Sequence, residues 1–177
     1  LDRFQMKNGV HIITAEDKQP TDVKASEANY EQTNGKIFLN GKAEIAQGSG
    51  YIRGDNLNAD LFPNKKVKFA LARGNAYLKQ ATNERITEVA APELNASFNE
   101  NQQLQNAVSL GASNVNLIPT TAQDYSKISL SAPNAIRLNF QANGFLHEMQ
   151  TDGRTTIQLN APNNAADAAN KRLTADR

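Results

Sequence analysis

The sequence predicts an all-β fold: a twisted antiparallel β-jelly roll of two facing sheets, built from repeated strand–corner–strand units. Three observations support this prediction. Apolar and polar residues alternate along most of the 177 residues, turn-forming residues separate the alternating runs, and similar units recur. Alternation with a period of two places the apolar side chains on one face of a strand, whereas a helix repeats about every 3.6 residues. An apolar share of 39% suits strands that bury only one face.

The alternation is clearest in five runs, which cover residues 36–45, 94–98, 128–132, 136–140 and 157–161. Short strands joined by turns, with no long helical run between them, are typical of a sandwich, a barrel or a solenoid. The strongest hairpin signal is Asn34-Gly35, because both residue types tolerate a positive φ. Further turn signals are Lys7-Asn8-Gly9, Phe62-Pro63-Asn64, Asn99-Glu100-Asn101 and Ala142-Asn143-Gly144.

The units recur at intervals of roughly 30 to 45 residues, which indicates a repeat architecture. In each unit a glycine interrupts the longer strand, at Gly41, Gly74, Gly111 and Gly153. Glycine inside a strand marks a bulge or a tight bend, so we expect these four to occupy one structural position. An Ala-Pro pair recurs at 91–92, 132–133 and 161–162. Because proline cannot donate to a β-ladder, we expect each pair to mark a corner where a strand passes between the sheets.

The last unit begins at Lys171 and stops at the chain end, so we expect its strands to lack partners within the chain and to expose unpaired backbone there. Residues 162–170 are rich in alanine and asparagine, lack alternation and are expected to form a loop. We interpret residues 1–177 as a single domain. Because the sequence begins at Leu1 without an initiator methionine, we expect it to be a processed segment or part of a longer chain.

Composition excludes several classes of function. A net charge of +1, without clustered basic residues and stacking aromatic residues, argues against a nucleic-acid-binding protein. The sequence has no cysteine, and its two histidines, His11 and His147, are expected to be surface residues without a metal-ligand pattern. No nucleophile elbow or phosphate-binding loop is present. We therefore expect no enzyme activity, no metal and no cofactor.

The repeated pattern resembles the OstA-like domain of the LptA, LptC and LptD lipopolysaccharide-transport proteins. The residues that carry the resemblance are Gly41 to Ile45, Ile52 to Leu57 and Ala72 to Leu78, within a similarity from about Val23 to Asp176. The resemblance implies a V-shaped jelly roll in the periplasm that binds lipopolysaccharide through its lipid A acyl chains and carries it towards the outer membrane. It also implies partners of the same fold that join end to end by strand addition, including head-to-tail association with itself.

A carrier of acyl chains needs an extended apolar slot and no catalytic group, because each methylene removed from water gains about 0.8 kcal/mol. We expect the inward apolar rows to form this slot, with the small side chains of Ala43, Ala59, Ala76 and Ala96 leaving room. The candidate lipid-binding residues are Ile37, Leu39, Ala43, Ile45, Leu57, Ala59, Leu61, Ala76, Leu78, Leu94, Ala96, Phe98, Val115, Ile128, Leu130, Ile136, Leu138, Phe140, Ile157 and Leu159. Each of them could instead be ordinary core, which is the default for an inward residue.

Other interpretations remain open from the sequence. The main alternative is a structural or adhesive β-solenoid without a lipid ligand, for which we would expect uniform repeats and a filled interior. A polysaccharide-acting β-helix enzyme is less favoured, because no stacked cluster of charged residues is visible. The densest basic run, residues 65–68, is interpreted as a solvated turn and the guard of an edge strand, with lipid phosphate at the rim of the slot as the alternative.

Overall fold

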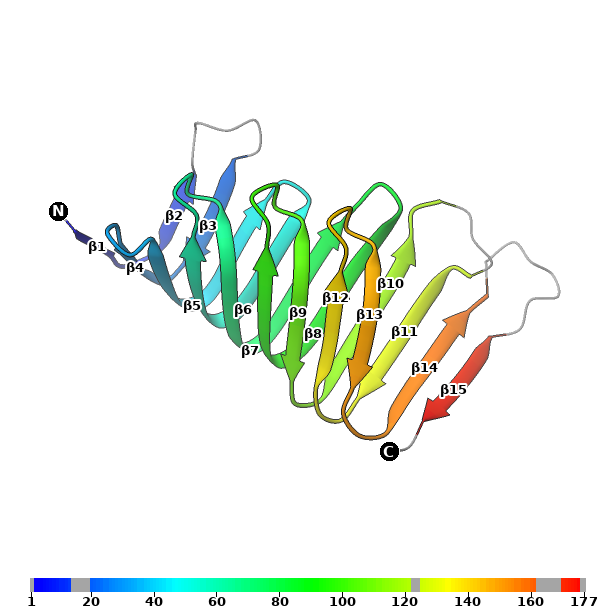
Figure 1. The fold of residues 1–177 in the computed structure, drawn as a ribbon. Helices are drawn as coiled ribbons and strands as arrows, with labels where there is room; N and C mark the ends of the chain where they lie inside the picture. Colours follow the sequence, from blue (N-terminus) through cyan, green and yellow to red (C-terminus); the bar gives the residue numbers. More distant parts are fainter. Residues whose placement is uncertain (1, 14–19, 122–124, 162–169, 176–177) are drawn as a thin grey trace.

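The computed structural model describes residues 2–13, 20–121, 125–161 and 170–175, and these form antiparallel strands without a helix (Figure 1). The all-β prediction is therefore confirmed. The strands are β1 (Arg3–Met6), β2 (Val10–Ile13), β3 (Thr21–Ala25), β4 (Glu27–Glu31), β5 (Lys36–Gln47), β6 (Gly50–Leu61), β7 (Val67–Ala81), β8 (Arg85–Phe98), β9 (Leu104–Leu110), β10 (Ser113–Pro119), β11 (Lys127–Ala132), β12 (Ile136–Phe140), β13 (Leu146–Thr151), β14 (Thr155–Asn160) and β15 (Lys171–Ala175).

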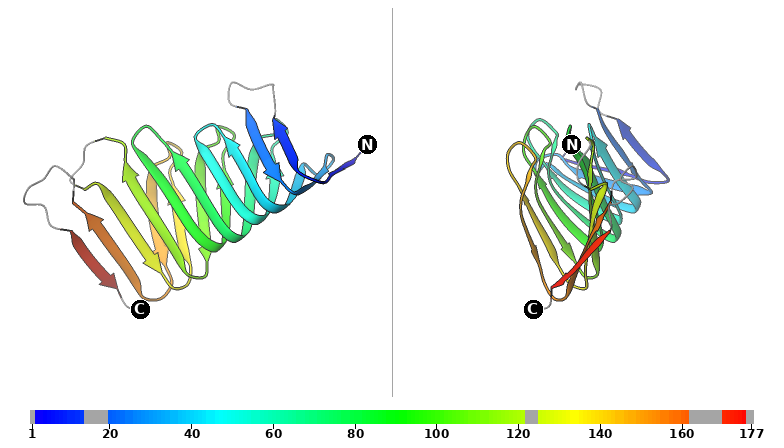
Figure 2. Two further views of the ribbon diagram at one scale, coloured as in Figure 1. Left: turned by 180° about the vertical axis from the view of Figure 1, so that it is seen from behind. Right: turned by 90° about the vertical axis from the view of Figure 1, so that its right-hand side faces the viewer.

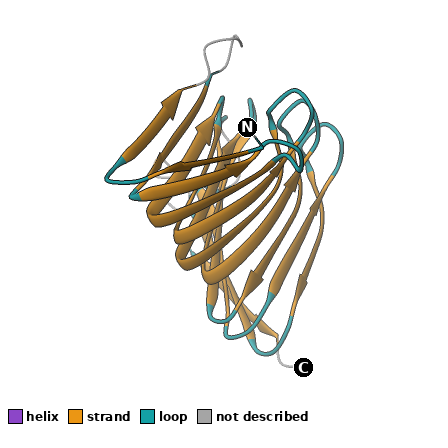
Figure 3. Cartoon of the chain, turned by 90° about the vertical axis from the view of Figure 1, so that its left-hand side faces the viewer, coloured by secondary structure: helices purple, strands orange, loops and turns teal. Residues whose placement is uncertain are grey.

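The strands form two facing layers, which we call sheet I and sheet II. Sheet I contains β1, β4, the halves of β5 to β8 that include residues 36–40, 56–61, 67–73 and 93–98, and then β9, β12 and β13. Sheet II contains β2, β3, the other halves of β5 to β8, and then β10, β11, β14 and β15. Because β5 to β8 run through both layers, the layers join along one edge and diverge at the other, as the end-on views show (Figures 2 and 3).

The joined edge is a row of corners, and the predicted glycine position lies there. Gly41, Gly74, Gly111 and Gly153 all have a positive φ, between 71° and 81°, and each lies where the chain passes between the sheets. A Cβ on Gly111 would lie 3.1 Å from Pro92 Cγ, so neighbouring corners are in close contact. The common position predicted for these glycines is confirmed. Gly9, predicted only as a turn residue, is a further corner, with φ of 90° between β1 and β2.

The Ala-Pro corners are confirmed in two of three cases. Pro92 lies at the bend of β8, and Pro133 lies between β11 in sheet II and β12 in sheet I. The third expectation, at Ala161, is wrong as a switch between sheets, because the flanking strands β14 and β15 pair with each other in sheet II. For the same reason the expectation that the strand beginning at Lys171 lacks a partner within the chain is wrong, and only its outer edge is unpaired among the described strands. Pro162 and most of the predicted loop lie outside the described residues.

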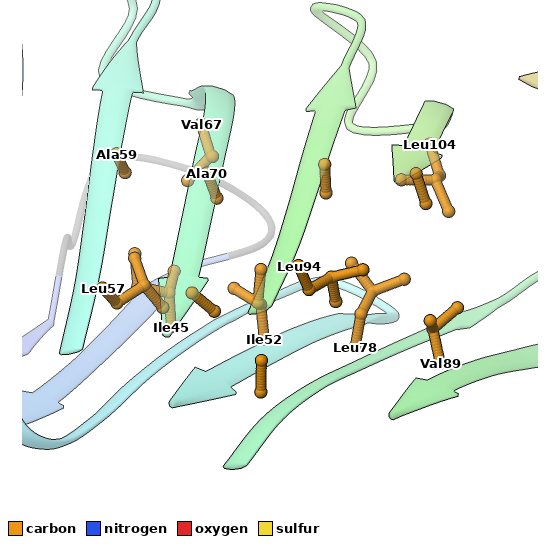
Figure 4. Close-up of a cluster of buried hydrophobic side chains, with 14 of the residues drawn as sticks. Ile45, Ile52, Leu57, Ala59, Val67, Ala70, Leu78, Val89, Leu94 and Leu104 are labelled. Atoms are coloured by element: carbon orange, nitrogen blue, oxygen red, sulfur yellow. The ribbon is translucent and has the colours of Figure 1, made fainter. Parts of the chain in front are cut away.

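The inward faces of both sheets form one hydrophobic core (Figure 4). On sheet II the residues next to the corners are small, such as Ala43, Ala76 and Ala132, whereas the next inward row is larger and includes Ile45, Ile52 and Leu78. Small side chains near the corner let the two backbones converge, and the larger row fills the space as the sheets diverge. This change from small to large side chains lets the core of the central strands pack closely.

Polar contacts cross the outer face of sheet II. Tyr77 lies half-buried on β7, its ring 6.1 Å from that of Tyr51 and 5.3 Å from the guanidinium of Arg53. Its hydroxyl donates a 3.0 Å hydrogen bond to Glu88, which also accepts from Asn116. Burial first, and then this hydrogen bond, raise the pKa of Tyr77 to about 12. The contacts tie β6, β7, β8 and β10 together on the face opposite the core.

This raised pKa predicts a loss of stability in alkaline solution. The folded chain keeps the Tyr77 proton up to about pH 12, whereas an unfolded tyrosine loses it near its ordinary pKa of 10.0. The free energy of unfolding should therefore fall as pH rises from 10 to 12. Denaturant unfolding across that range should show the decline, and Tyr77→Phe should flatten it. A Tyr77→Phe curve as steep as that of the parent would contradict the assignment.

Candidate apolar cavity

An apolar cavity of about 490 Å³ lies between the sheets at the N-terminal end of the array. Strands β1 and β4 of sheet I form one wall, and β2 and β3 of sheet II form the other. Both halves of β5, the end of β6, the start of β7 and the turn between β6 and β7 complete it. The lining residues are Phe4, Gln5, Met6, Ile12, Thr21, Val23, Tyr30, Ile37, Ile45, Leu61, Lys65 and Val67.

The cavity exists because the end strands diverge and carry few inward side chains. β1 and β2 have only four residues each, and they leave their corner at Gly9 in different sheets. Met6 and Ile12 are only partly buried, and Phe4 keeps 42% of its surface exposed. An apolar space that is open to water at one end, rather than sealed in the core, can admit an apolar ligand.

Polar groups hold the walls and the rim in place. Arg3 on β1 donates a hydrogen bond to Glu31 on β4, and Asn34 donates to the same carboxylate. These two hydrogen bonds lower the pKa of Glu31. Lys65 is the one charged residue among the described lining residues, and its ammonium donates a 2.9 Å hydrogen bond to the hydroxyl of Tyr30. The site therefore combines an apolar wall with a single cation at its rim.

The structure places the candidate residues on the inward faces, as the alternation predicts. Three of them, Ile37, Ile45 and Leu61, line the cavity. Five are only partly buried, namely Leu61, Ile128, Phe140, Ile157 and Leu159, and the others are buried. Most of the buried ones pack against each other along the central strands.

The four alanines expected to leave room are closely packed instead. The side chains of Ala43, Ala59, Ala76 and Ala96 are at most 2% exposed. The cavity beside Ile45, Ile52 and Phe98 has a volume of only about 20 Å³. In this structure the small side chains of the alanines bring the sheets together. The larger apolar space lies at the N-terminal end of the array, where β1 and β2 are the last strands of sheet I and sheet II.

Sequence reasoning missed most of the cavity wall. Phe4, Met6, Ile12 and Val23 belong to short strands near residues 14–19, which lie outside the described residues. Their alternation over four or five residues is too brief to separate from chance, although the Phe4–Met6 spacing fits a period of two.

The interpretation of residues 65–68 is confirmed for the turn and wrong for the edge strand. Lys65 and Lys66 lie in the turn between β6 and β7, where Lys65 is exposed. Val67 and Lys68 begin β7, which pairs with β6 on one side and β8 on the other and is therefore internal. Val67 is buried, and Lys65 lies at the cavity rim. The two histidines are exposed as predicted, and His11 lies 3.0 Å from Asp22. Within the described residues, no group of three or more His, Cys, Asp or Glu side chains could hold a metal, and no helix is long and apolar enough to cross a membrane.

One family model matches the N-terminal part of the chain, which includes most of the cavity wall. Residues 2–65 match the LptA/(LptD N-terminal domain) LPS transport protein family. The family resemblance inferred from the sequence is therefore confirmed for this LptA-type segment. A search of the curated proteins found no match.

The fold is also similar to a solved structure. The crystal structure of LptH from Pseudomonas aeruginosa is described as the LptA homologous periplasmic component of the conserved lipopolysaccharide transport device. It aligns with a TM-score of 0.55 and 15% sequence identity, over 93% of this chain and 99% of that chain. The predicted LptA-like jelly roll is therefore confirmed along nearly the whole array, with the two layers joined at one edge and open at the other.

Proposed function

We propose that this chain is a non-enzymatic, periplasmic carrier of lipopolysaccharide that holds lipid A acyl chains between its sheets. The observation that carries the proposal is the cavity of about 490 Å³, lined by apolar side chains and open at one end of an LptA-like array. The match of residues 2–65 to an LPS transport family supports the same ligand class. In this proposal the whole chain acts as one OstA-like domain.

The chemistry of the cavity suits hydrocarbon. Each methylene that leaves water for an apolar site gains about 0.8 kcal/mol, so several methylenes suffice for useful affinity. Ile37, Ile45 and Leu61 would contact the acyl chain of the lipid directly. The remaining candidate residues would serve if the sheets separate further along the array.

Lys65 gives the site a way to orient a charged lipid. Its ammonium lies at the rim beside Tyr30, whereas the interior wall is apolar. An anionic headgroup, such as a phosphate of lipid A, would be attracted to this cation while the acyl chain enters below it. The proposal therefore places the headgroup outside the sheets and the acyl chain inside.

The structural β-solenoid without a ligand remains the alternative. A solenoid of this kind would have uniform repeats and an interior filled by side chains. Two features favour a carrier instead. The apolar cavity is open at one end of the array, and the repeats are not uniform, because the short strands β1 to β4 each lie in one sheet whereas the long strands β5 to β8 bend through both.

Photo-crosslinking tests the proposal directly. A benzophenone amino acid at Phe4, which lines the cavity, should crosslink to lipid A added to the full chain. Phe69 is the matched control, because it is an aromatic residue of similar exposure, 37% against 42%, on the outer face of β7. Equal labelling at Phe4 and Phe69, or no labelling at Phe4, would refute binding in the cavity.

We also propose that copies of this chain, or other Lpt-type jelly rolls, associate end to end. Among the described strands, β1 and β2 have a free edge at one end of the array, and β13 and β15 have one at the other. Ile13 on β2 and Leu173 on β15 are each 60% exposed. An exposed edge with apolar side chains is a template for adding a strand.

Leu173→Asp should weaken such association by about tenfold or more, because an added charge at an edge opposes strand addition. Sedimentation velocity at increasing protein concentration would measure the change. Leu110→Asp is the control, since Leu110 is also exposed but lies on the internal strand β9. Loss of association in both variants would indicate a non-specific effect of charge.

A further inference from the structure

The apolar cavity has an inner end, which faces the middle of the array. Ile45 and Val67 line the cavity and also line a much smaller space that follows it along the sheets. Phe98 at the end of β8 and Gln102 in the turn after it bound this smaller space on the side away from the cavity. The open volume therefore falls from about 490 Å³ in the cavity to about 20 Å³ beside β8.

Phe98 fills the slot because of its place on β8. It is the inward residue farthest from the corner at Pro92, on the part of β8 that belongs to sheet I. The inward residues nearer the corner, Leu94 and Ala96, are smaller. Because the sheets diverge with distance from the corners, the largest side chain lies where the slot is widest. The ring is only 9% exposed, so it occupies the space between the sheets at this level.

Hydrogen bonds hold the turn after Phe98 in place. The side chain of Asn99 accepts 3.0 Å hydrogen bonds from two backbone N–H groups of the same turn. Gln102 has φ of 61°, and its side-chain amide donates a 3.0 Å hydrogen bond to the backbone carbonyl of Val67. That bond joins the β8–β9 turn to a residue of the cavity wall. Phe98 and Gln102 therefore close the inner end together, and we call them the stopper.

The volume of the cavity limits how much hydrocarbon it holds. A protein cavity of about 150 Å³ admits one benzene ring, or about six carbon atoms. In proportion, the cavity of about 490 Å³ admits roughly 20 carbon atoms. One tetradecyl chain is within this limit, whereas two such chains exceed it.

We propose that the apolar cavity takes one acyl chain at a time, and that no chain passes along the slot beyond β8 while the stopper is in place. The occupant is one acyl chain of a lipid with an anionic headgroup, because Lys65 supplies a single cation at the rim. The inference rests on the proposed function and adds to it which part of the slot the lipid enters first. The other chains of a lipid A molecule stay outside the cavity.

Photolabelling on both sides of the stopper tests the inference. A diazirine analogue of leucine replaces either Leu61, which lines the cavity, or Leu104, which pairs with Phe98 on the far side of the stopper. The analogue is close to leucine in size and inserts into C–H bonds that it touches. The probe is tetradecyl phosphate, a single chain with an anionic headgroup, added to the full chain below its critical micelle concentration. It should label the analogue at Leu61 and leave the analogue at Leu104 unlabelled.

A smaller side chain in the stopper should open the way to Leu104. Phe98→Val removes the ring, so tetradecyl phosphate should label the analogue at Leu104 in this variant. Gln102→Ala opens the stopper without removing a buried ring, and it carries the same expectation should Phe98→Val fail to fold. Phe140→Val is the matched control, since Phe140 lies on β12 outside the cavity lining, and it should leave Leu104 unlabelled.

The outcomes separate this inference from the proposed function. Labelling at Leu104 in the parent as strong as that at Leu61 would overturn the stopper and leave acyl-chain binding in place. Absence of labelling at Leu104 in every stopper variant that folds would overturn it as well. No labelling at Leu61 would refute binding in the cavity, and the inference with it.

Native mass spectrometry of the full chain counts the bound lipid molecules. Saturating tetradecyl phosphate should give one ligand per protein chain, because two tetradecyl chains exceed the roughly 20 carbon atoms that the cavity admits. A second ligand bound at equal occupancy would overturn the limit of one chain.

Discussion

Ile12→Trp is expected to lower the affinity for acyl chains about 100-fold. Ile12 lies on β2 with its side chain in the wall of the apolar cavity. An indole in its place would occupy the space of three or four methylenes, which removes about 3 kcal/mol of binding free energy. Tryptophan is well tolerated in strands, so the fold should persist. Displacement of a fluorescent fatty acid by lipid A would measure the affinity.

The neighbouring residue supplies a matched control for this variant. Ile13 is on the same strand, but its side chain is 60% exposed and is not part of the cavity lining. Ile13→Trp should bind lipid as the parent does, with the same strand, the same substitution and the same change in bulk. Equal loss of affinity in the two variants would show that the effect arises from the strand and not from the cavity.

Gly74→Ala should lower the free energy of unfolding by about 2 kcal/mol. Gly74 has φ of 71° at the corner of β7, a conformation that costs a residue with a Cβ roughly 1–2 kcal/mol. The new Cβ would also collide with the carboxylate of Asp55 at the adjacent corner. Urea unfolding monitored by circular dichroism would measure the change, and a loss below about 0.5 kcal/mol would contradict the argument.

Two further variants separate the causes of that loss. Combining Gly74→Ala with Asp55→Ala removes the contact with the carboxylate but keeps the Cβ of residue 55, which would lie 2.9 Å from the new Cβ, and keeps the unfavourable φ. A double-mutant cycle should therefore show that part of the lost stability is recovered. Lys42 follows Gly41 with φ of 50°, and Lys42→Gly should leave stability unchanged or raise it, because glycine adopts that conformation freely. A lower free energy of unfolding for Lys42→Gly would show that contacts of the lysine side chain contribute more to stability than its positive φ costs.

Much of the fold could be predicted because its signals are local and repeated. The alternation between Ile37 and Ile45 identifies the inward face, and the glycines at Gly41 and Gly74 identify the bends. Each recurrence strengthens the others, because one unit predicts where the next must turn. The Ala-Pro pairs predicted that strands pass between two facing sheets, and the family resemblance added the V shape of the jelly roll.

The site could be predicted only in part, because a cavity forms where the inward side chains of the two sheets do not fill the space between them. The alternation predicts that Ala59 and Ala96 face inward, but it does not reveal how far the opposite sheet lies from them. That distance depends on the taper from the corner to the open edge, a property of both sheets together.

The single row of corners also bears on how the molecule would come apart. Each strand pairs only with its immediate neighbours, so β15 is secured on one side alone, while β6 and β7 are secured on both. In such a one-dimensional array the cost of opening rises from the ends to the middle. The molecule is therefore firmest at its centre and most pliable at its two extremities, which are β1 and β2 at one end and β13 and β15 at the other.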